Sequence, residues 1–184
     1  MTDIRTKIQS MSNEEVREQL ARYMAADNSL RADITSIEVR QNPSMGARCR
    51  YSVLFVDKEG HKTAVQFPDR YSRLLYIYTL LHPQGYQRRT PAANDYLALR
   101  RLYSLLYLKD SQALLKTIAS AGSSHFFSHY IAQSRKAIRQ MPVSSDQLAI
   151  DRPQSHNGKV LIPFVAEGGS VTVDSSLRNN MSNL

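Results

Sequence analysis

The segment 128–139 gathers side chains that can form hydrogen bonds with phosphate groups and with the edges of bases. Its polar candidates are His129, Gln133, Arg135, Lys136 and Arg139. Arg and Lys neutralise phosphates and contact guanine, and Gln can pair with adenine. On one face of a helix, such side chains suit the major groove of DNA.

The same segment carries an apolar pattern that predicts this helix. Phe127, Ile131, Ser134 and Ile138 follow the spacing i, i+4, i+7, i+11 of one helical face. We therefore expect a helix that Ser123 or Ser124 caps and that ends before Pro142. The polar candidates fall largely on another face, so the helix would have an apolar back and a basic front.

The positive charge of the chain is concentrated around this helix. Residues 67–140 hold eleven Lys and Arg against three Asp, and this surplus of eight equals the net charge of the whole chain. A surplus confined to one block indicates a polyanionic partner, most often nucleic acid. The pairs Arg88-Arg89 and Arg100-Arg101 are read either as ordinary surface charge or as phosphate contacts.

The N-terminal third predicts one helix followed by strands. Ser12 and Glu15 match a capping box, and Asp27-Asn28-Ser29 ends that helix. Branched and aromatic residues over 34–39, 51–56 and 61–67 indicate a small antiparallel sheet, with a hairpin turn at Asp57–Gly60.

The middle of the chain predicts further helices. Asp69 caps a helix over about 70–81 whose buried stripe is Tyr71, Leu74, Leu75 and Tyr78. Thr90-Pro91 begins a helix to about residue 108, and Asp110 begins a short one that Gly122 ends.

After Pro142 we expect a hairpin and then a loose end. Gln147–Asp151 and Lys159–Val165 read as two strands joined by a loop with the turn signal Asn157-Gly158. Residues 171–173 could add a last strand, and Ser175–Leu184 is expected to fray. The expected fold class is α+β, with three parts: a helix-plus-sheet unit over 1–67, a winged-helix-like unit over 68–165, and a flexible tail over 166–184.

Residues 67–165 resemble a group of short, functionally uncharacterised bacterial proteins. The matching stretches are Leu75–Gly85, Leu99–Tyr103, Ile131–Ile138, and Leu148–Asp151 with Leu161–Pro163. That pattern is in turn loosely similar to the winged-helix output domain of two-component response regulators. The chain departs from the first family in its middle helix, where Tyr96, Leu97 and Arg100 replace acidic and glycine positions.

The resemblance implies a non-enzymatic protein that binds double-stranded DNA and regulates transcription. Gln133, Arg135, Lys136 and Arg139 would face the groove with His129 beside them, while Arg88, Arg89, Arg152 and Lys159 would hold the backbone. The open alternative is an interaction or assembly adaptor whose basic face docks an acidic protein. In the first case residues 1–67 would mediate self-association or partner binding. In the second, the sheet edge of residues 33–67 could pair with another chain.

Other chemistries have less support in the sequence. His125 and His129 have a spacing that suits one metal, but no third ligand follows, so we expect neither a metal nor a cofactor. No nucleophile elbow, paired carboxylates or phosphate-cradling glycine loop is present, so we expect no enzyme. The tyrosines of the helical block are read mainly as core, with base stacking as the alternative.

The composition also bears on location. No run of about 18 or more apolar residues occurs, so no membrane span is expected. The N-terminus lacks an apolar signal core, and the lone Cys49 has no partner for an internal disulfide. A cytoplasmic protein is therefore expected.

Overall fold

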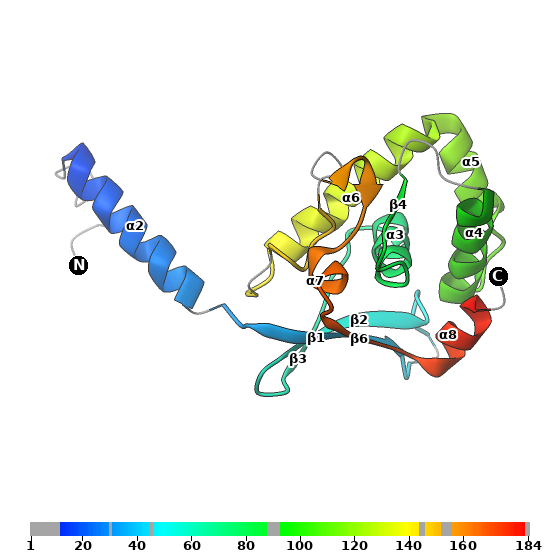
Figure 1. Cartoon of the computed structure of the whole chain (residues 1–184), viewed down its shortest axis with the longest axis horizontal. Coiled ribbons are helices and arrows are strands. Elements are labelled where there is room, and N and C mark those ends of the chain that lie inside the picture. The colour runs from blue at the N-terminus through cyan, green and yellow to red at the C-terminus, as the bar shows by residue number, and fades with distance from the viewer. Residues whose placement is uncertain are drawn as a thin grey trace. The chain divides into compact units, whose positions relative to one another are not determined.

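The computed structural model of the protein describes residues 12–29, 31–44, 46–87, 93–143, 146–151 and 156–182. The described residues form a mixed α/β fold that divides into two compact units, 1–32 and 33–184 (Figure 1). The elements are α2 (Asn13–Ser29), β1 (Ile34–Gln41), β2 (Tyr51–Asp57), β3 (Lys62–Ala64), α3 (Arg70–Leu80), β4 (Tyr86–Gln87), α4 (Ala93–Tyr107), α5 (Gln112–Ala121), α6 (Ser123–Arg139), β5 (Lys159–Val160), α7 (Pro163–Ala166), β6 (Ser170–Val173) and α8 (Ser175–Met181).

The first unit contains helix α2, and its start confirms the predicted capping box. The backbone N–H of Ser12 donates to Glu15 Oε2 at 2.8 Å. In return, the N–H of Glu15 donates to Ser12 Oγ at 3.3 Å. The helix ends at Ser29, as the run of polar residues predicted. These local bonds explain where the helix begins without any tertiary contact.

The second unit contains a four-stranded sheet in the order β3-β2-β1-β6. The pairs β1–β2 and β2–β3 are antiparallel, which confirms the predicted antiparallel sheet, although its third strand covers only Lys62–Ala64 of the expected 61–67. Strand β6 pairs in parallel with β1, from Ser36 opposite Ser170 to Val39 opposite Val173. The predicted boundary at residue 67 therefore differs from the division observed, since these strands belong to the same compact unit as helices α3 to α8.

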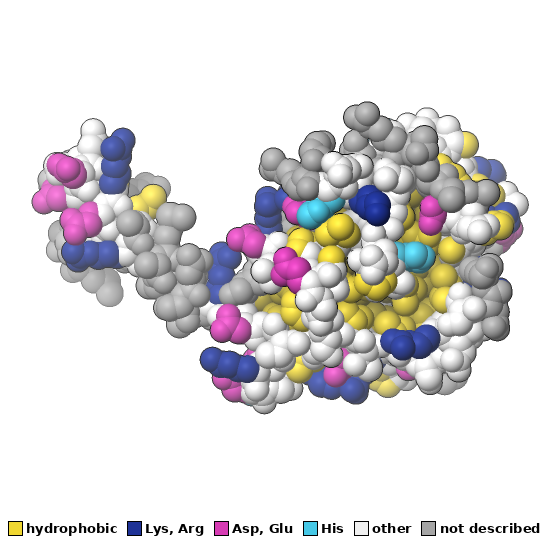
Figure 2. Space-filling view, viewed as in Figure 1, with side chains coloured by type: hydrophobic (Ala, Val, Ile, Leu, Met, Phe, Trp, Pro, Cys, Tyr) yellow, Lys and Arg dark blue, Asp and Glu magenta, His cyan; other side chains and the backbone are white. Residues whose placement is uncertain are grey.

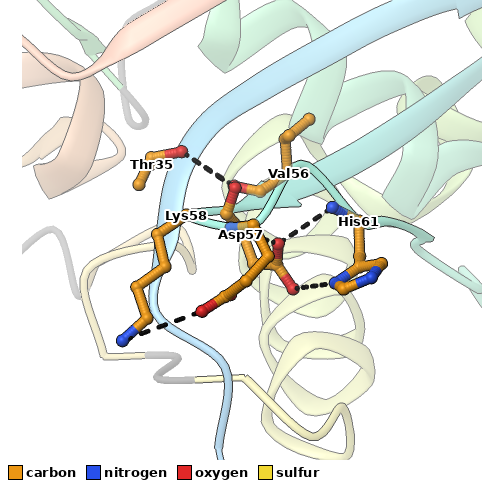
Figure 3. Close-up of polar contacts among 6 residues, drawn as sticks. Thr35, Val56, Asp57, Lys58 and His61 are labelled. Carbon is orange, nitrogen blue, oxygen red and sulfur yellow. Dashed lines mark hydrogen bonds and ion pairs between the residues drawn. The ribbon is translucent and has the colours of Figure 1, made fainter.

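The β2–β3 hairpin turns at Asp57–Gly60, as the sequence predicted. Asp57 Oδ1 accepts the N–H groups of Glu59 at 3.0 Å and His61 at 2.9 Å, and its Oδ2 lies 3.2 Å from His61 Nδ1 (Figure 3). The Thr35 hydroxyl donates to the Val56 carbonyl across the strands at 3.3 Å. Gly60 has φ +85°, a value that glycine tolerates without strain.

Helix α3 forms the centre of the second unit. Nine of its eleven residues are buried, so its burial extends well beyond the predicted stripe of Tyr71, Leu74, Leu75 and Tyr78. Asp69 caps it as predicted, accepting the N–H of Ser72 at 2.7 Å. Its neighbours reach it from several sides: Phe55 of β2 packs 6.4 Å from Tyr76, and Tyr103 of α4 packs 6.1 Å from Tyr71, both between ring centroids.

The helices after α3 confirm the predicted order. Helix α4 ends at Tyr107, one residue before the predicted end, while the proposed start at Thr90-Pro91 lies outside the described residues. Helix α5 stops at Gly122, whose φ of +78° makes it the break between α5 and α6.

The predicted wing hairpin is wrong. Residues 147–151 form no strand, and β5 pairs antiparallel with β4, with Tyr86 opposite Val160. Two backbone bonds link the two expected strands, from Asp151 N–H to the Leu161 carbonyl and from Phe164 N–H to the Gln147 carbonyl, each at 2.9 Å. Asn157-Gly158 does form a turn, with φ of +53° and +82°. Pro163 then begins helix α7, because its fixed φ suits the first helical position.

The predicted fraying of residues 175–184 is also wrong over the described part. Asp174 caps helix α8 by accepting the N–H of Ser176 at 2.9 Å. Leu177 is fully buried, and the Tyr51 hydroxyl lies 2.6 Å from Ser176 Oγ. The expected strand at 171–173 is confirmed as part of β6. The burial of Leu177 and the β1–β6 pairing hold this segment in place.

Gly85→Ala is expected to destabilise the fold by at least about 1 kcal/mol, which lowers the Tm by about 2–4 °C or more for a chain of this size. Gly85 has φ +73°, and an added Cβ would lie 2.8 Å from the Val160 carbonyl oxygen. Gly46→Ala is the control, because nothing lies within 4 Å of its added Cβ. Thermal unfolding measures both variants. An unchanged Tm for Gly85→Ala would contradict the β4–β5 pairing.

Leu177→Ala is expected to lower the free energy of unfolding by about 2–5 kcal/mol, since it removes a fully buried side chain. Its exposed neighbour supplies the control, and Arg178→Ala should change stability by less than about 0.5 kcal/mol. Urea denaturation measures both. Equal, small effects would show that α8 does not dock.

Candidate nucleic-acid interface

Helix α6 has one buried face, which packs against α3. Its buried residues are Phe126, Phe127, Ile131, Ser134, Ala137 and Ile138. The four residues predicted from the spacing are all among them. The ring of Phe126 lies 5.7 Å from Tyr71 of α3 in an edge-to-face arrangement, which fixes the rotation of α6 about its axis.

The opposite face of α6 carries the predicted basic side chains. His129, Lys136 and Arg139 are exposed, as is His125, whereas Gln133 and Arg135 are half-buried. The helix contains no Asp or Glu, so no carboxylate on α6 offsets these cations. We call His125, His129, Lys136 and Arg139 the basic face. Arg135 differs from them, because it already interacts with another group of the protein.

The C-terminal half of α6 forms a shallow hollow. Ala132, Arg135, Lys136, Arg139 and Gln140 line it. The small side chain of Ala132 leaves room between longer cationic neighbours, so an anion can approach the helix surface there. Lys136 and Arg139 also lie in the last turn, where the helix dipole favours positive charge.

Of the four residues predicted to contact the DNA backbone, only Lys159 lies within the described residues. Lys159 lies exposed on β5, opposite Gln87 of β4. The Tyr86 ring packs 5.9 Å from Phe127, so the two-stranded sheet lies beside the N-terminal half of α6. Arg88, Arg89 and Arg152 lie outside the described residues.

A second cationic cluster was not singled out from the sequence. A hollow at the N-terminus of α3 is lined by four cations and four aromatic rings, and we call it the aromatic groove. Its cations are Arg48, Arg70, Arg73 and Lys109, and its rings belong to Phe67, Tyr71, Tyr107 and Tyr130. Three of the cations were counted in the charged block, but Arg48 comes from the loop before β2. The fold brings these positions together from four separate segments.

Another hollow lies between α3, α4, β6 and α8, and its walls combine apolar and polar side chains. Figure 2 shows yellow side chains over the middle of this face, where Figure 1 draws α3, α7 and β6. Its polar groups include Asp95, which accepts the Tyr78 hydroxyl at 2.7 Å. Burial and this carboxylate raise the pKa of Tyr78, so the phenol stays protonated at neutral pH. His82 Nδ1 lies 2.7 Å from the Tyr78 carbonyl and holds the end of α3.

The metal candidates have little support in the described residues. The rings of His125 and His129 lie 6.2 Å apart, and no third ligand joins them there. Asp57, Glu59 and His61 place ligand atoms within 4.8 Å of one another. The Asp57 carboxylate, however, already accepts the N–H groups that form the hairpin turn. The hydrogen bonds of the turn therefore already account for this carboxylate without a metal ion.

No protein-family model, curated protein or solved structure matches this chain. Within the described ranges, no helix is both long and apolar enough to cross a membrane.

Phe127→Ala is expected to lower the free energy of unfolding by about 3–5 kcal/mol, because Phe127 is fully buried on the inner face of α6. His129→Ala, on the exposed face, should stay within about 0.5 kcal/mol of the wild type. Chemical denaturation of the two variants tests the rotation of α6. A large loss for His129→Ala would mean that this side chain is buried.

Proposed function

We propose that the protein is a non-enzymatic DNA-binding protein that inserts α6 into the major groove of duplex DNA. The observation that carries this proposal is the division of α6 into a buried apolar face and an exposed, acid-free basic face. A helix that packs this way is held firmly while its outer side chains remain free for a ligand.

The dimensions of α6 suit this role. Its 17 residues give a helix roughly 25 Å long, at 1.5 Å per residue. The major groove is about 12 Å wide and admits one α-helix with its side chains. Lys136 and Arg139 would contact phosphates or guanine, Gln133 would reach a base edge, and His129 would contact the backbone. Arg135 would contribute chiefly through the packing of the helix.

The surrounding elements support a winged-helix-like arrangement. Helices α3, α4 and α6 occur in the order that the family resemblance implies, with α5 between α4 and α6, and a β-strand comes after α6. That strand, β5, pairs with β4 rather than with a hairpin partner. The two-stranded sheet would therefore take the place of the wing, with Lys159 touching the flanking backbone. Arg88, Arg89 and Arg152 would add phosphate contacts on this proposal.

The adaptor alternative has one observation in its favour. Strand β3 lies at an edge of the sheet, and its three residues are all exposed. An exposed edge can pair with a strand of another chain. On this reading the basic face would dock an acidic protein, and the sheet of residues 34–64 would extend into the partner. Self-association through residues 1–67 stays a prediction.

The test is duplex binding measured by fluorescence anisotropy, over roughly 50 to 200 mM salt. The full chain is compared with the double variant Lys136→Ala/Arg139→Ala. Each lost phosphate contact should lower the slope of log affinity against log salt by about 0.9, so the slope should fall by about 1–2 and binding should weaken at least tenfold.

The matched control is Arg17→Ala/Lys58→Ala, which removes two exposed charges outside α6. It should retain nearly wild-type affinity. Equal losses in both double variants would mean that only net charge matters. No duplex binding at the lowest salt would contradict the proposal and favour the adaptor.

A further inference from the structure

The aromatic groove combines two features that a single ligand can satisfy at once. It is lined by four cations and by four aromatic rings, contributed by the loop before β2, the start of α3, the end of α4 and the middle of α6. We infer that this groove binds a nucleotide, with its phosphate on the cations and its base against the rings. The inference is independent of duplex binding by α6, because none of the four cations belongs to that helix.

The charge of the groove favours an anion. Arg48, Arg70 and Lys109 are exposed and Arg73 is half-buried. Within the described residues, none of the four forms an ion pair with a carboxylate. Asp69 lines the groove as well, but its Oδ1 caps α3 by accepting the Ser72 N–H. The N-terminal end of α3 adds the positive end of its dipole.

The rings are held in place before any ligand arrives. The Tyr107 hydroxyl donates to the Arg70 carbonyl at 2.9 Å, and the Tyr71 hydroxyl lies 3.1 Å from Thr117 Oγ1. Tyr130 packs against Tyr71 with centroids 5.1 Å apart. These contacts fix the ring planes, so a base that stacks on them loses little extra conformational freedom.

The cations lie directly beside these rings. The Arg70 guanidinium sits 5.2 Å from the Tyr71 centroid, and that of Arg73 sits 5.9 Å from the Phe67 centroid. Such cation–π contacts place positive charge next to flat apolar surface. A phosphate on the guanidinium groups would leave the attached base within reach of the rings.

Tyr130, like Phe67 and Tyr107, is half-buried and can meet a ligand, whereas Tyr71 is buried and supports the other rings from behind. Burial and the nearby Asp69 carboxylate raise the pKa of the Tyr130 phenol, although Arg70 opposes them. The hydroxyl therefore stays protonated at neutral pH and can donate a hydrogen bond. The main role of Tyr130 in the groove is to stack on a base.

The combination of cations and rings suits a nucleotide better than simpler ligands. Inorganic phosphate would bind the cations but would make no use of the rings. In a duplex the faces of the bases are stacked on one another, so they cannot stack on the rings. A free nucleotide and a nucleotide within a single strand share the required chemistry, because stacking on aromatic side chains tolerates any base.

The test is isothermal titration of the full chain with three probes: AMP, ribose 5-phosphate and octathymidylate. AMP should bind at least about tenfold more tightly than ribose 5-phosphate, which lacks the base. If octathymidylate binds much more tightly than AMP, the ligand is a nucleotide within a single nucleic-acid strand. Similar affinities would identify a free nucleotide. Either result supports the groove.

Variants then locate the binding. Arg48→Ala/Lys109→Ala should weaken AMP binding about tenfold or more, and Tyr130→Leu should weaken it by a similar factor. Tyr130→Phe keeps the ring and should remain within about threefold of the wild type. Circular dichroism melting of each variant checks that the fold is intact.

Three results would overturn the inference: no binding of AMP or octathymidylate, equal binding of AMP and ribose 5-phosphate, or binding that falls in Lys136→Ala/Arg139→Ala but not in Arg48→Ala/Lys109→Ala. The last would place all nucleic-acid contact on α6. If the wild-type chain binds AMP but binds no duplex at the lowest salt, the proposed function is contradicted and this inference stands.

Discussion

The burial of α3 is the constraint on which the second unit depends. Nine of its eleven residues are buried, and the sheet, α4 and α6 each pack against it. Each neighbour must therefore turn an apolar face toward this helix. For α6, the result is that its acid-free side faces outward. For the start of α3, the result is that Arg70 and Arg73 line one hollow together with rings from α4 and α6. The basic face and the aromatic groove are both consequences of packing around one helix.

The C-terminal part of the chain closes this arrangement. Strand β6 adds to the sheet beside β1, and Leu177 of α8 enters the core. Residues distant in sequence thus share one unit, and the strands of the N-terminal half depend on the last third of the chain. A ligand on α6 would act on a helix anchored from several sides, which favours a rigid recognition element over one that orders on binding.

Local signals account for most of what the sequence predicted. Ser12 with Glu15, Asp69 with Ser72, and Gly122 each fix a helix end through bonds within a few residues, so the helix order could be read directly. The β4–β5 pairing could not be predicted from the sequence, since two-residue strands leave no periodic pattern. In addition, three helices separate Tyr86 from its partner Val160 along the chain. The aromatic groove was missed for a related reason: Arg48 and Tyr130 become neighbours only when the sheet and α6 pack on α3. Leu177 sits in a polar segment whose composition predicted fraying.

The most direct test of the account is to map the duplex contact residue by residue on the full chain, through amide chemical shifts in a ¹H–¹⁵N titration at low salt. The account predicts that the largest shifts fall on the outer positions of α6, around His129, Lys136 and Arg139, with small shifts on β1 to β3. Shifts concentrated on the sheet, or absent from α6 while the duplex binds, would contradict the claim that this helix is the nucleic-acid interface.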